Sequence, residues 1–208
     1  MKNPFNHFDR IFLINLPERT DRLMESLDEC AKVGIQNRVE IREGIKTGPQ
    51  GLTHVMHRIL SEVDSSETIL IMEDDVKFVN NPTKTLTLAM EQIQWDDWDM
   101  LYLGALTKQR LHLRYPSWYR LKYGYCCHAI VFNRRIIPTV RLLLQSFLDK
   151  DAVVDRLLAG YIQPIYSCYL ISPMIADQRP SFSDLENKVT DYGLLKHFEN
   201  MQSYTKPR

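Results

Sequence analysis

The chain has 208 residues, of which 44% are apolar and 25% are charged, and its formal net charge is zero. This composition is typical of a globular domain and argues against disordered, collagen-like and repeat proteins. No stretch approaches the roughly 20 apolar residues of a membrane span, and residues 1–10 lack the apolar run of a secretory signal. We therefore expect a cytoplasmic protein without a transmembrane segment, for which peripheral membrane contact remains open.

Apolar patterns along the chain predict strands that alternate with helices. The expected strands cover residues 10–16, 38–42, 68–72, 99–103, 129–132 and 162–171. The expected helices run from Thr20 or Asp21 to Gly34, over 52–63, from Pro82 through Ile93, over 135–148 and over 152–159. This alternation predicts an α/β protein with a mainly parallel central sheet flanked by helices. We expect a single domain over residues 1–208, with residues 172–208 as an extended C-terminal tail.

Three consecutive carboxylates, Glu73, Asp74 and Asp75, follow directly on the predicted strand at 68–72. Such close charges repel one another unless they share a cation, and Mg²⁺ and Mn²⁺ prefer oxygen ligands. Because residues i and i+2 of an extended segment point the same way, Glu73 and Asp75 are the predicted metal ligands. The alternative is a solvated acidic turn, but ligands of parallel α/β sheets bind at strand ends, which favours the metal site.

A second polar cluster follows the first predicted strand. Asn15 ends that strand, where its amide can bind a nucleobase or a ribose. Arg19 and Arg22 lie one helical turn apart, and guanidinium groups suit bidentate contacts with phosphates. The alternative is an exposed helix N-terminus whose arginines form surface pairs with aspartates.

Residues 100–148 contain eight Lys or Arg and no Asp or Glu. Aromatic residues are interleaved with these cations, and aromatic rings stack on sugars or bases while cations hold phosphates. We therefore predict an anionic acceptor, which is a glycolipid, a glycan or a nucleic acid. The predicted acceptor-binding residues are Arg110, Arg114, Trp118 and Tyr119. The alternative is a solvated basic hairpin.

Taken together, these segments resemble glycosyltransferase family 25, which contains bacterial lipooligosaccharide sugar transferases and collagen galactosyltransferases. The matching segments occur in family order at residues 11–22, 51–60, 69–79, 98–105, 124–135, 153–158 and 173–184. The resemblance implies a GT-A fold, a nucleotide-diphosphate sugar as donor, bound Mn²⁺ and transfer with inversion at the anomeric centre.

The resemblance also implies roles for single residues. Glu73-x-Asp75 stands in the place of the family's D-x-D-type metal motif, and Asp155 stands in its active centre. An inverting transfer needs a carboxylate that takes the acceptor proton, so Asp155 is the predicted base. Its alternative role is a helix N-terminal carboxylate beside Arg156 or Lys150. The other predicted donor contacts are Asp74, Gly104 and His128.

Three functions remain open from the sequence. The first is a catalytic glycosyltransferase, the second is a non-catalytic module that binds nucleotide sugars, and the third is an enzyme that glycosylates a nucleic-acid base. The joint presence of Glu73, Asp75 and Asp155 argues against the second. The third would account for the basic stretch, and salt-sensitive binding of oligonucleotides would favour it.

Overall fold

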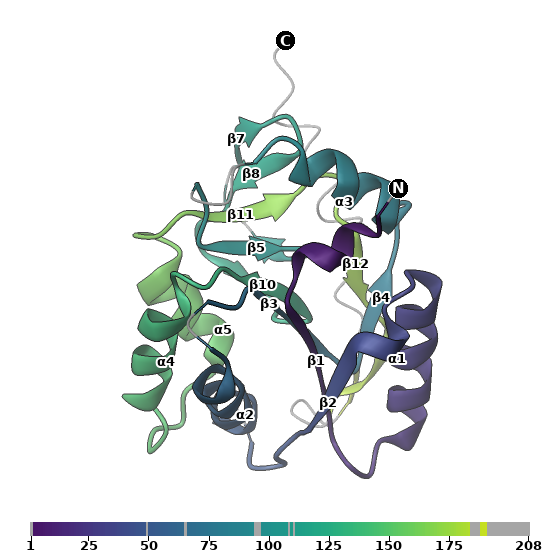
Figure 1. The fold of residues 1–208 in the computed structure, drawn as a ribbon. Coiled ribbons are helices and arrows are strands. Elements are labelled where there is room, and N and C mark those ends of the chain that lie inside the picture. The colour runs from purple at the N-terminus through teal and green to yellow at the C-terminus, as the bar shows by residue number, and fades with distance from the viewer. Residues whose placement is uncertain are drawn as a thin grey trace.

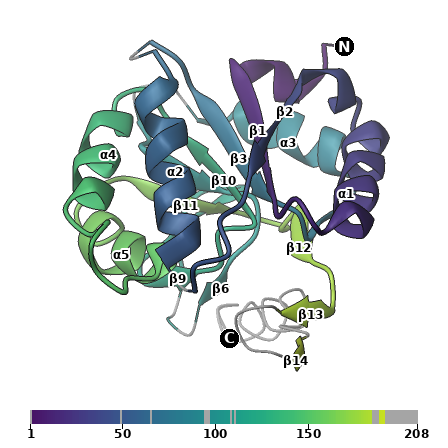
Figure 2. The same ribbon diagram turned by 90° about the horizontal axis from the view of Figure 1, so that it is seen from below.

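The computed structural model describes residues 2–183, except 49, 65, 94–96, 108 and 110, together with residues 188–190. Its centre is an eight-stranded sheet with helices on both faces (Figure 1, Figure 2). In sheet order, the strands are β2 (Val39–Glu43), β1 (Arg10–Asn15), β3 (Ile69–Glu73), β10 (Ala129–Phe132), β5 (Met100–Tyr102), β11 (Cys168–Ile171), β8 (Trp118–Arg120) and β7 (His112–Tyr115).

Most strands of this sheet share one direction, as the sequence predicts. β10 is antiparallel to β3 and β5, and β8 is antiparallel to β11 and β7, so only these two run against the others. The remaining neighbours pair in parallel. The C-terminal ends of β1 and β3 therefore lie side by side at one edge of the sheet, where an α/β protein binds ligands.

Two apolar layers enclose the sheet. One layer packs it against α2 (Gln50–Glu62), α4 (Ile137–Gln145), α5 (Val154–Leu157) and the π-helix η3 (Leu158–Ile162). The other packs it against α1 (Thr20–Lys32), α3 (Pro82–Met90) and the short 3-10 helix η1 (Pro4–His7). Within β1, Phe12 faces the first layer and Leu13 the second. Burial on both faces is why such strands read as unbroken apolar runs.

Several short strands lie outside the main sheet. β4 (Val76–Phe78) pairs with β12 (Ala176–Gln178), β6 (Leu106–Thr107) with β9 (Gly124–Tyr125), and β13 (Ser181–Ser183) with β14 (Lys188–Thr190). In Figure 1, β12 and β4 run beside each other next to α1. The β4–β12 pair positions the candidate site, because it brings residues near 178 to the turn after β3.

The structure differs from the sequence prediction in places. The strand expected over 162–171 begins only at Cys168, because the π-helix η3 continues α5 through Ile162. The predicted tail contains β12 and the β13–β14 pair, while residues 184–187 and 191–208 lie outside the described part of the chain. No helix in that described part has the length and apolar character needed to span a bilayer.

Candidate active site

The acidic turn consists of Glu73, which ends β3, and of Asp74 and Asp75, which connect it to β4. The middle carboxylate, that of Asp74, faces α1. Asp74 Oδ1 accepts a hydrogen bond from Arg22 Nη1 at 2.9 Å, and Ser26 Oγ donates to the Asp74 carbonyl at 2.7 Å. Burial raises the pKa of Asp74, and the Arg22 charge only partly opposes that rise. Asp74 is therefore engaged with the protein through Arg22 and Ser26.

A second set of contacts holds the turn from the side of β12. Gln178 Nε2 donates to Asp75 Oδ2 at 3.1 Å, and the Arg179 backbone N–H donates to the Asp75 carbonyl at 2.8 Å. Arg179 Nη2 also donates to Ser26 Oγ at 2.9 Å and to the Asp74 carbonyl at 3.1 Å. Sequence reasoning did not assign these two residues a role. The one feature of the sequence that pointed to a role for them was their position in segment 173–184, which resembles glycosyltransferase family 25.

Electrostatics place Asp155 near the acidic turn. The pKa of Glu73 is raised well above its usual value, first by burial and then by the charges of Asp75, Asp74 and Asp155. Burial, Asp155 and Glu73 together raise the pKa of Cys126 to about 12, so its thiol stays protonated. Asp155 lies in the first turn of α5. Residues about 80 positions apart in sequence are thus within electrostatic reach of one another.

Unpartnered oxygens mark the same point. Among the described residues, the buried side-chain oxygens without a hydrogen-bond partner are Asn15 Oδ1, Asp75 Oδ1, Asp155 Oδ1 and Gln178 Oε1. A buried acceptor without a donor is costly, and a bound cation or a hydrogen-bond donor of a ligand would satisfy it. Asn15 ends β1, directly beside the end of β3. All four atoms belong to residues at or next to the acidic turn, or to the nearby Asp155.

These oxygens suit a divalent cation that a ligand helps to hold. Mg²⁺ and Mn²⁺ favour carboxylate, carbonyl and water oxygens, and Mg²⁺ is usually bound by one or two carboxylates plus substrate phosphates. Within the described ranges, no group of three or more His, Cys, Asp or Glu side chains could hold a metal ion by itself. The donor set therefore fits an ion completed by phosphate oxygens and water, rather than a closed protein site.

Arg19, another predicted donor contact, is engaged by its neighbour. Its Nε and Nη2 each donate to the Asp21 carboxylate at 3.0 Å, at the N-terminus of α1. This hydrogen bonding is the main reason why the pKa of Asp21 falls to about 2. The Arg–Asp surface pair considered from the sequence is therefore present. A phosphate would have to compete with Asp21 for this guanidinium.

Gly104 and His128 pack against each other inside the protein. A Cβ at Gly104 would lie 2.0 Å from the Ala176 carbonyl oxygen and 2.6 Å from His128 Nε2. His128 is fully buried, and burial lowers its pKa to about 4. The imidazole of this predicted donor contact thus lies in the interior of the protein. Gly104 allows the first residue of β12 to approach the segment that follows β5 closely.

The predicted acceptor residues do not form one surface. Trp118 is fully buried and its Nε1 donates to the Ala89 carbonyl at 2.9 Å, which corrects the prediction that it contacts an acceptor. Tyr119 is half-buried against the core, and Arg114 is exposed on the edge strand β7. Arg110 lies outside the described residues. Strands β7 and β8, which carry Arg114, Trp118 and Tyr119, lie at the opposite edge of the sheet from β2 and several strands away from β3.

Two other arginines of residues 100–148, Arg120 and Arg135, have partners within the protein. Arg120 donates to four backbone carbonyls, among them Cys168 at 2.8 Å and Gln163 at 3.1 Å. Arg135 forms an ion pair with Asp99 at 2.9 Å. These arginines stabilise chain ends and turns of the fold. Arg120 and Arg135 therefore serve the fold itself.

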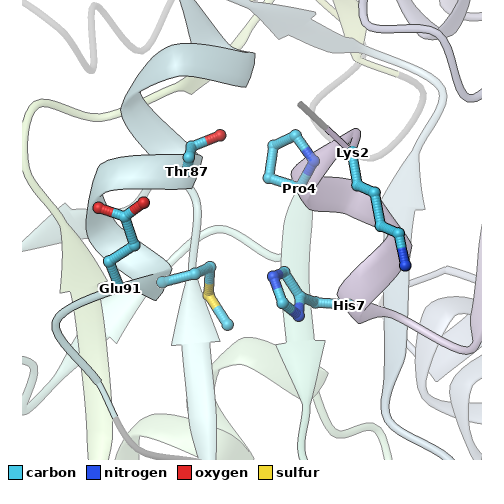
Figure 3. Close-up of a pocket in the computed structure, with 6 residues that line it drawn as sticks. Lys2, Pro4, His7, Thr87 and Glu91 are labelled. Carbon is cyan, nitrogen blue, oxygen red and sulfur yellow. The ribbon is translucent and has the colours of Figure 1, made fainter.

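One pocket of about 260 Å³ lies away from the acidic turn (Figure 3). Its lining residues come from η1, α3 and the positions next to these helices, and are Lys2, Pro4, His7, Thr87, Met90 and Glu91. The acidic turn follows β3 at the opposite end of these parallel strands. This pocket is therefore separate from the candidate active site.

Comparisons with known proteins show the fold. No family model and no curated protein matches the chain. A glycosyltransferase involved in glycosylation of the major capsid of PBCV-1 is similar with a TM-score of 0.52 and 10% identity, over 93% of this chain and 98% of that one. The inositol-1-phosphate CTP transferase from T. maritima has a TM-score of 0.51 and 11% identity, over 97% and 99%.

Both solved structures are matched over nearly their whole length, and the identities are too low to show more than a shared fold. That fold occurs here in a glycosyltransferase and in a nucleotidyltransferase. The α/β architecture of the GT-A type, with helices on both faces of a mainly parallel sheet, is therefore confirmed. Fold alone does not decide which reaction the site performs.

Proposed function

We propose that this protein is a metal-dependent glycosyltransferase that moves a sugar from a nucleotide-diphosphate sugar to an acceptor hydroxyl with inversion. The observation that carries the proposal is the group of buried, unpartnered oxygens around the turn after β3. They lie where α/β sheets bind ligands, and oxygens of this kind suit a cation shared with a diphosphate. The resemblance of seven ordered segments to glycosyltransferase family 25 supports the same reaction.

The donor would bind across the ends of β1 and β3. Asn15 Oδ1 is buried and can accept a hydrogen bond from the nucleoside. Glu73 and Asp75 would hold Mn²⁺ or Mg²⁺, which neutralises charge on the departing diphosphate when bound. Arg22 keeps Asp74 fixed beside α1, so the two neighbouring carboxylates are presented in a constant orientation.

Asp155 is the proposed base. Its Oδ1 is buried without a partner, so it can take the proton of an acceptor hydroxyl. The acceptor oxygen then bonds to the anomeric carbon while the bond from that carbon to the diphosphate oxygen breaks, and the leaving diphosphate keeps the electron pair. Attack on the face opposite the leaving group inverts the configuration.

A nucleic-acid base is a weaker acceptor candidate. The observation in its favour was the absence of Asp and Glu from residues 100–148, and two of the arginines there, Arg120 and Arg135, are engaged in contacts within the protein. We therefore propose that the sugar is transferred to a hydroxyl group, and we do not restrict the acceptor to nucleic acids. The two strands that carry Arg114 and Tyr119 also lie several strands away from the acidic turn.

The test is a screen of nucleotide sugars with Mn²⁺ that follows slow hydrolysis of the donor and needs no acceptor. A glycosyltransferase breaks the bond between sugar and diphosphate and releases a nucleoside diphosphate, and EDTA should suppress this release. A nucleotidyltransferase given pyrophosphate would instead form a nucleoside triphosphate and a sugar phosphate. That second product pattern, or no reaction with any donor, would overturn the proposal.

A further inference from the structure

The two carboxylate oxygens of Asp75 have different surroundings. Oδ2 accepts a hydrogen bond from Gln178 Nε2 at 3.1 Å, whereas Oδ1 is buried without a partner. We infer that Gln178 is a positioning residue that leaves one oxygen of Asp75 for a divalent cation and thereby selects small octahedral ions over Ca²⁺. The inference rests on the proposed function, because it concerns the metal ligand of that site.

The backbone around Gln178 fixes its side-chain amide beside Asp75. β12 pairs with β4, which places Gln178 opposite Val76, the residue after Asp75. The next residue, Arg179, is bonded through its backbone N–H to the Asp75 carbonyl at 2.8 Å. Because an ionised carboxylate only accepts hydrogen bonds, the NH₂ group of the amide must face Asp75. The amide therefore follows the carboxylate and does not swing independently of it.

A carboxylate that binds both Gln178 and a cation restricts which divalent cation fits the site. Ca²⁺ takes six to eight oxygens at 2.3–2.6 Å and accepts bidentate carboxylates, whereas Mg²⁺ requires near-ideal octahedral geometry at 2.0–2.1 Å. An oxygen that already accepts from Gln178 is less available as a second ligand. Asp75 is thus biased toward contributing one oxygen, which suits Mg²⁺ and Mn²⁺. Without the amide, both oxygens could bind one larger ion.

The test compares cation binding in the wild type and in Gln178→Leu, which keeps the approximate volume and removes the donor. The signal of free Mn²⁺ in electron paramagnetic resonance would be titrated with protein, with and without UDP or GDP. Mg²⁺ and Ca²⁺ would then serve as competitors. We expect Gln178→Leu to gain Ca²⁺ affinity relative to Mg²⁺ by about tenfold. The matched control is Gln92→Leu, which loses an amide bonded to the Ser117 backbone N–H elsewhere.

The outcomes separate the two proposals. An unchanged Ca²⁺ to Mg²⁺ ratio, with Mn²⁺ bound by both proteins, overturns the role of Gln178 and leaves the proposed function standing. A wild type that binds no Mn²⁺, even with nucleotide, overturns the metal dependence itself. If Gln178→Leu does not fold, crystals of the wild type soaked with Mn²⁺ decide the question. Coordination by Asp75 Oδ1 alone is expected, and bidentate coordination would contradict the inference.

Discussion

Arg22 Nη1 lies 2.9 Å from Asp74 Oδ1, and only 12% and 9% of the two side chains are exposed. This ion pair joins α1 to the turn after β3. Burial raises the pKa of Asp74 although the guanidinium of Arg22 lowers it, so the desolvation of this carboxylate outweighs the effect of the neighbouring charge. Such pairs tolerate joint replacement by neutral groups better than the loss of one partner.

The first prediction concerns that pair. Arg22→Met leaves Asp74 buried without its cation and should lower the free energy of unfolding by about 3–5 kcal/mol. The double variant Arg22→Met with Asp74→Asn should recover most of the loss. Urea unfolding measures both variants. If the single and double variants were equally unstable, the charge pairing would not be the cause.

The second prediction concerns Asp75. Asp75→Asn keeps the size of the side chain but removes the charge that a cation needs. The Mn²⁺-dependent affinity for nucleotide should fall by more than the roughly 10–100-fold typical of outer-shell changes. Calorimetric titration with Asp28→Asn, an exposed carboxylate on α1, provides the control. Equal affinities in the three proteins would remove Asp75 from the metal site.

The third prediction separates binding from chemistry. Asp155→Asn should leave donor affinity unchanged and lower kcat by about 10²–10⁴-fold, because a general base is lost. Asp151→Asn, an exposed carboxylate just before the same helix, should behave as the wild type. A near-normal kcat in Asp155→Asn would exclude this residue as the base.

The fourth prediction compares two glycines. Gly104→Ala places a methyl group 2.0 Å from the Ala176 carbonyl oxygen, and the shift this forces should cost about 1–3 kcal/mol of stability. Gly160→Ala, in η3, meets no atom within 4 Å and should stabilise by about 0.4–1 kcal/mol. Thermal unfolding tests both changes. Similar melting temperatures for the two variants would show that the β5–β12 approach is looser than described.

The fifth prediction is a pH dependence. Because burial lowers the pKa of His128 to about 4 from 6.5, the unfolded chain binds the imidazole proton first as the pH falls. The contribution of His128 to stability is thus present above pH 6.5 and is lost between about pH 6.5 and 4. The full loss is about 3 kcal/mol.

The readout is the slope of unfolding free energy against pH in that window. His128→Leu should have a flatter slope than the wild type, whatever its absolute stability. His112→Leu, in which an exposed imidazole of β7 is replaced, should keep the wild-type slope. Comparing slopes removes the contribution of carboxylates that titrate in all three proteins. Identical slopes in all three would contradict the burial of His128.

Much of the fold was predictable because buried strands have a distinctive apolar pattern. Residues 10–16 and 68–72 were expected as strands and form β1 and β3 with small shifts at the ends. The reversed direction of β10 was not predictable, since the four apolar residues 129–132 carry no sign of orientation. β4 was missed because a three-residue strand is too short for periodicity to reveal.

The site was predictable only where it is local in sequence. Glu73 and Asp75 follow a strand directly, so their position could be expected. Gln178 reaches Asp75 only through the β4–β12 pairing, which no short-range pattern indicates. Trp118 was misassigned because its cationic neighbours suggested a surface, whereas its own side chain packs toward α3.

The β4–β12 pairing also makes the acidic turn depend on a distant part of the chain. The hydrogen bond from Gln178 to Asp75 joins residues 103 positions apart, and that from Arg179 to Asp74 joins residues 105 apart. Closing such long loops has an entropy cost, which slows the formation of contacts between residues so distant in sequence. During synthesis, the acidic turn leaves the ribosome long before β12 does. A fragment that ends before residue 176 would thus carry Glu73, Asp75 and Asp155 without the strand that orients them.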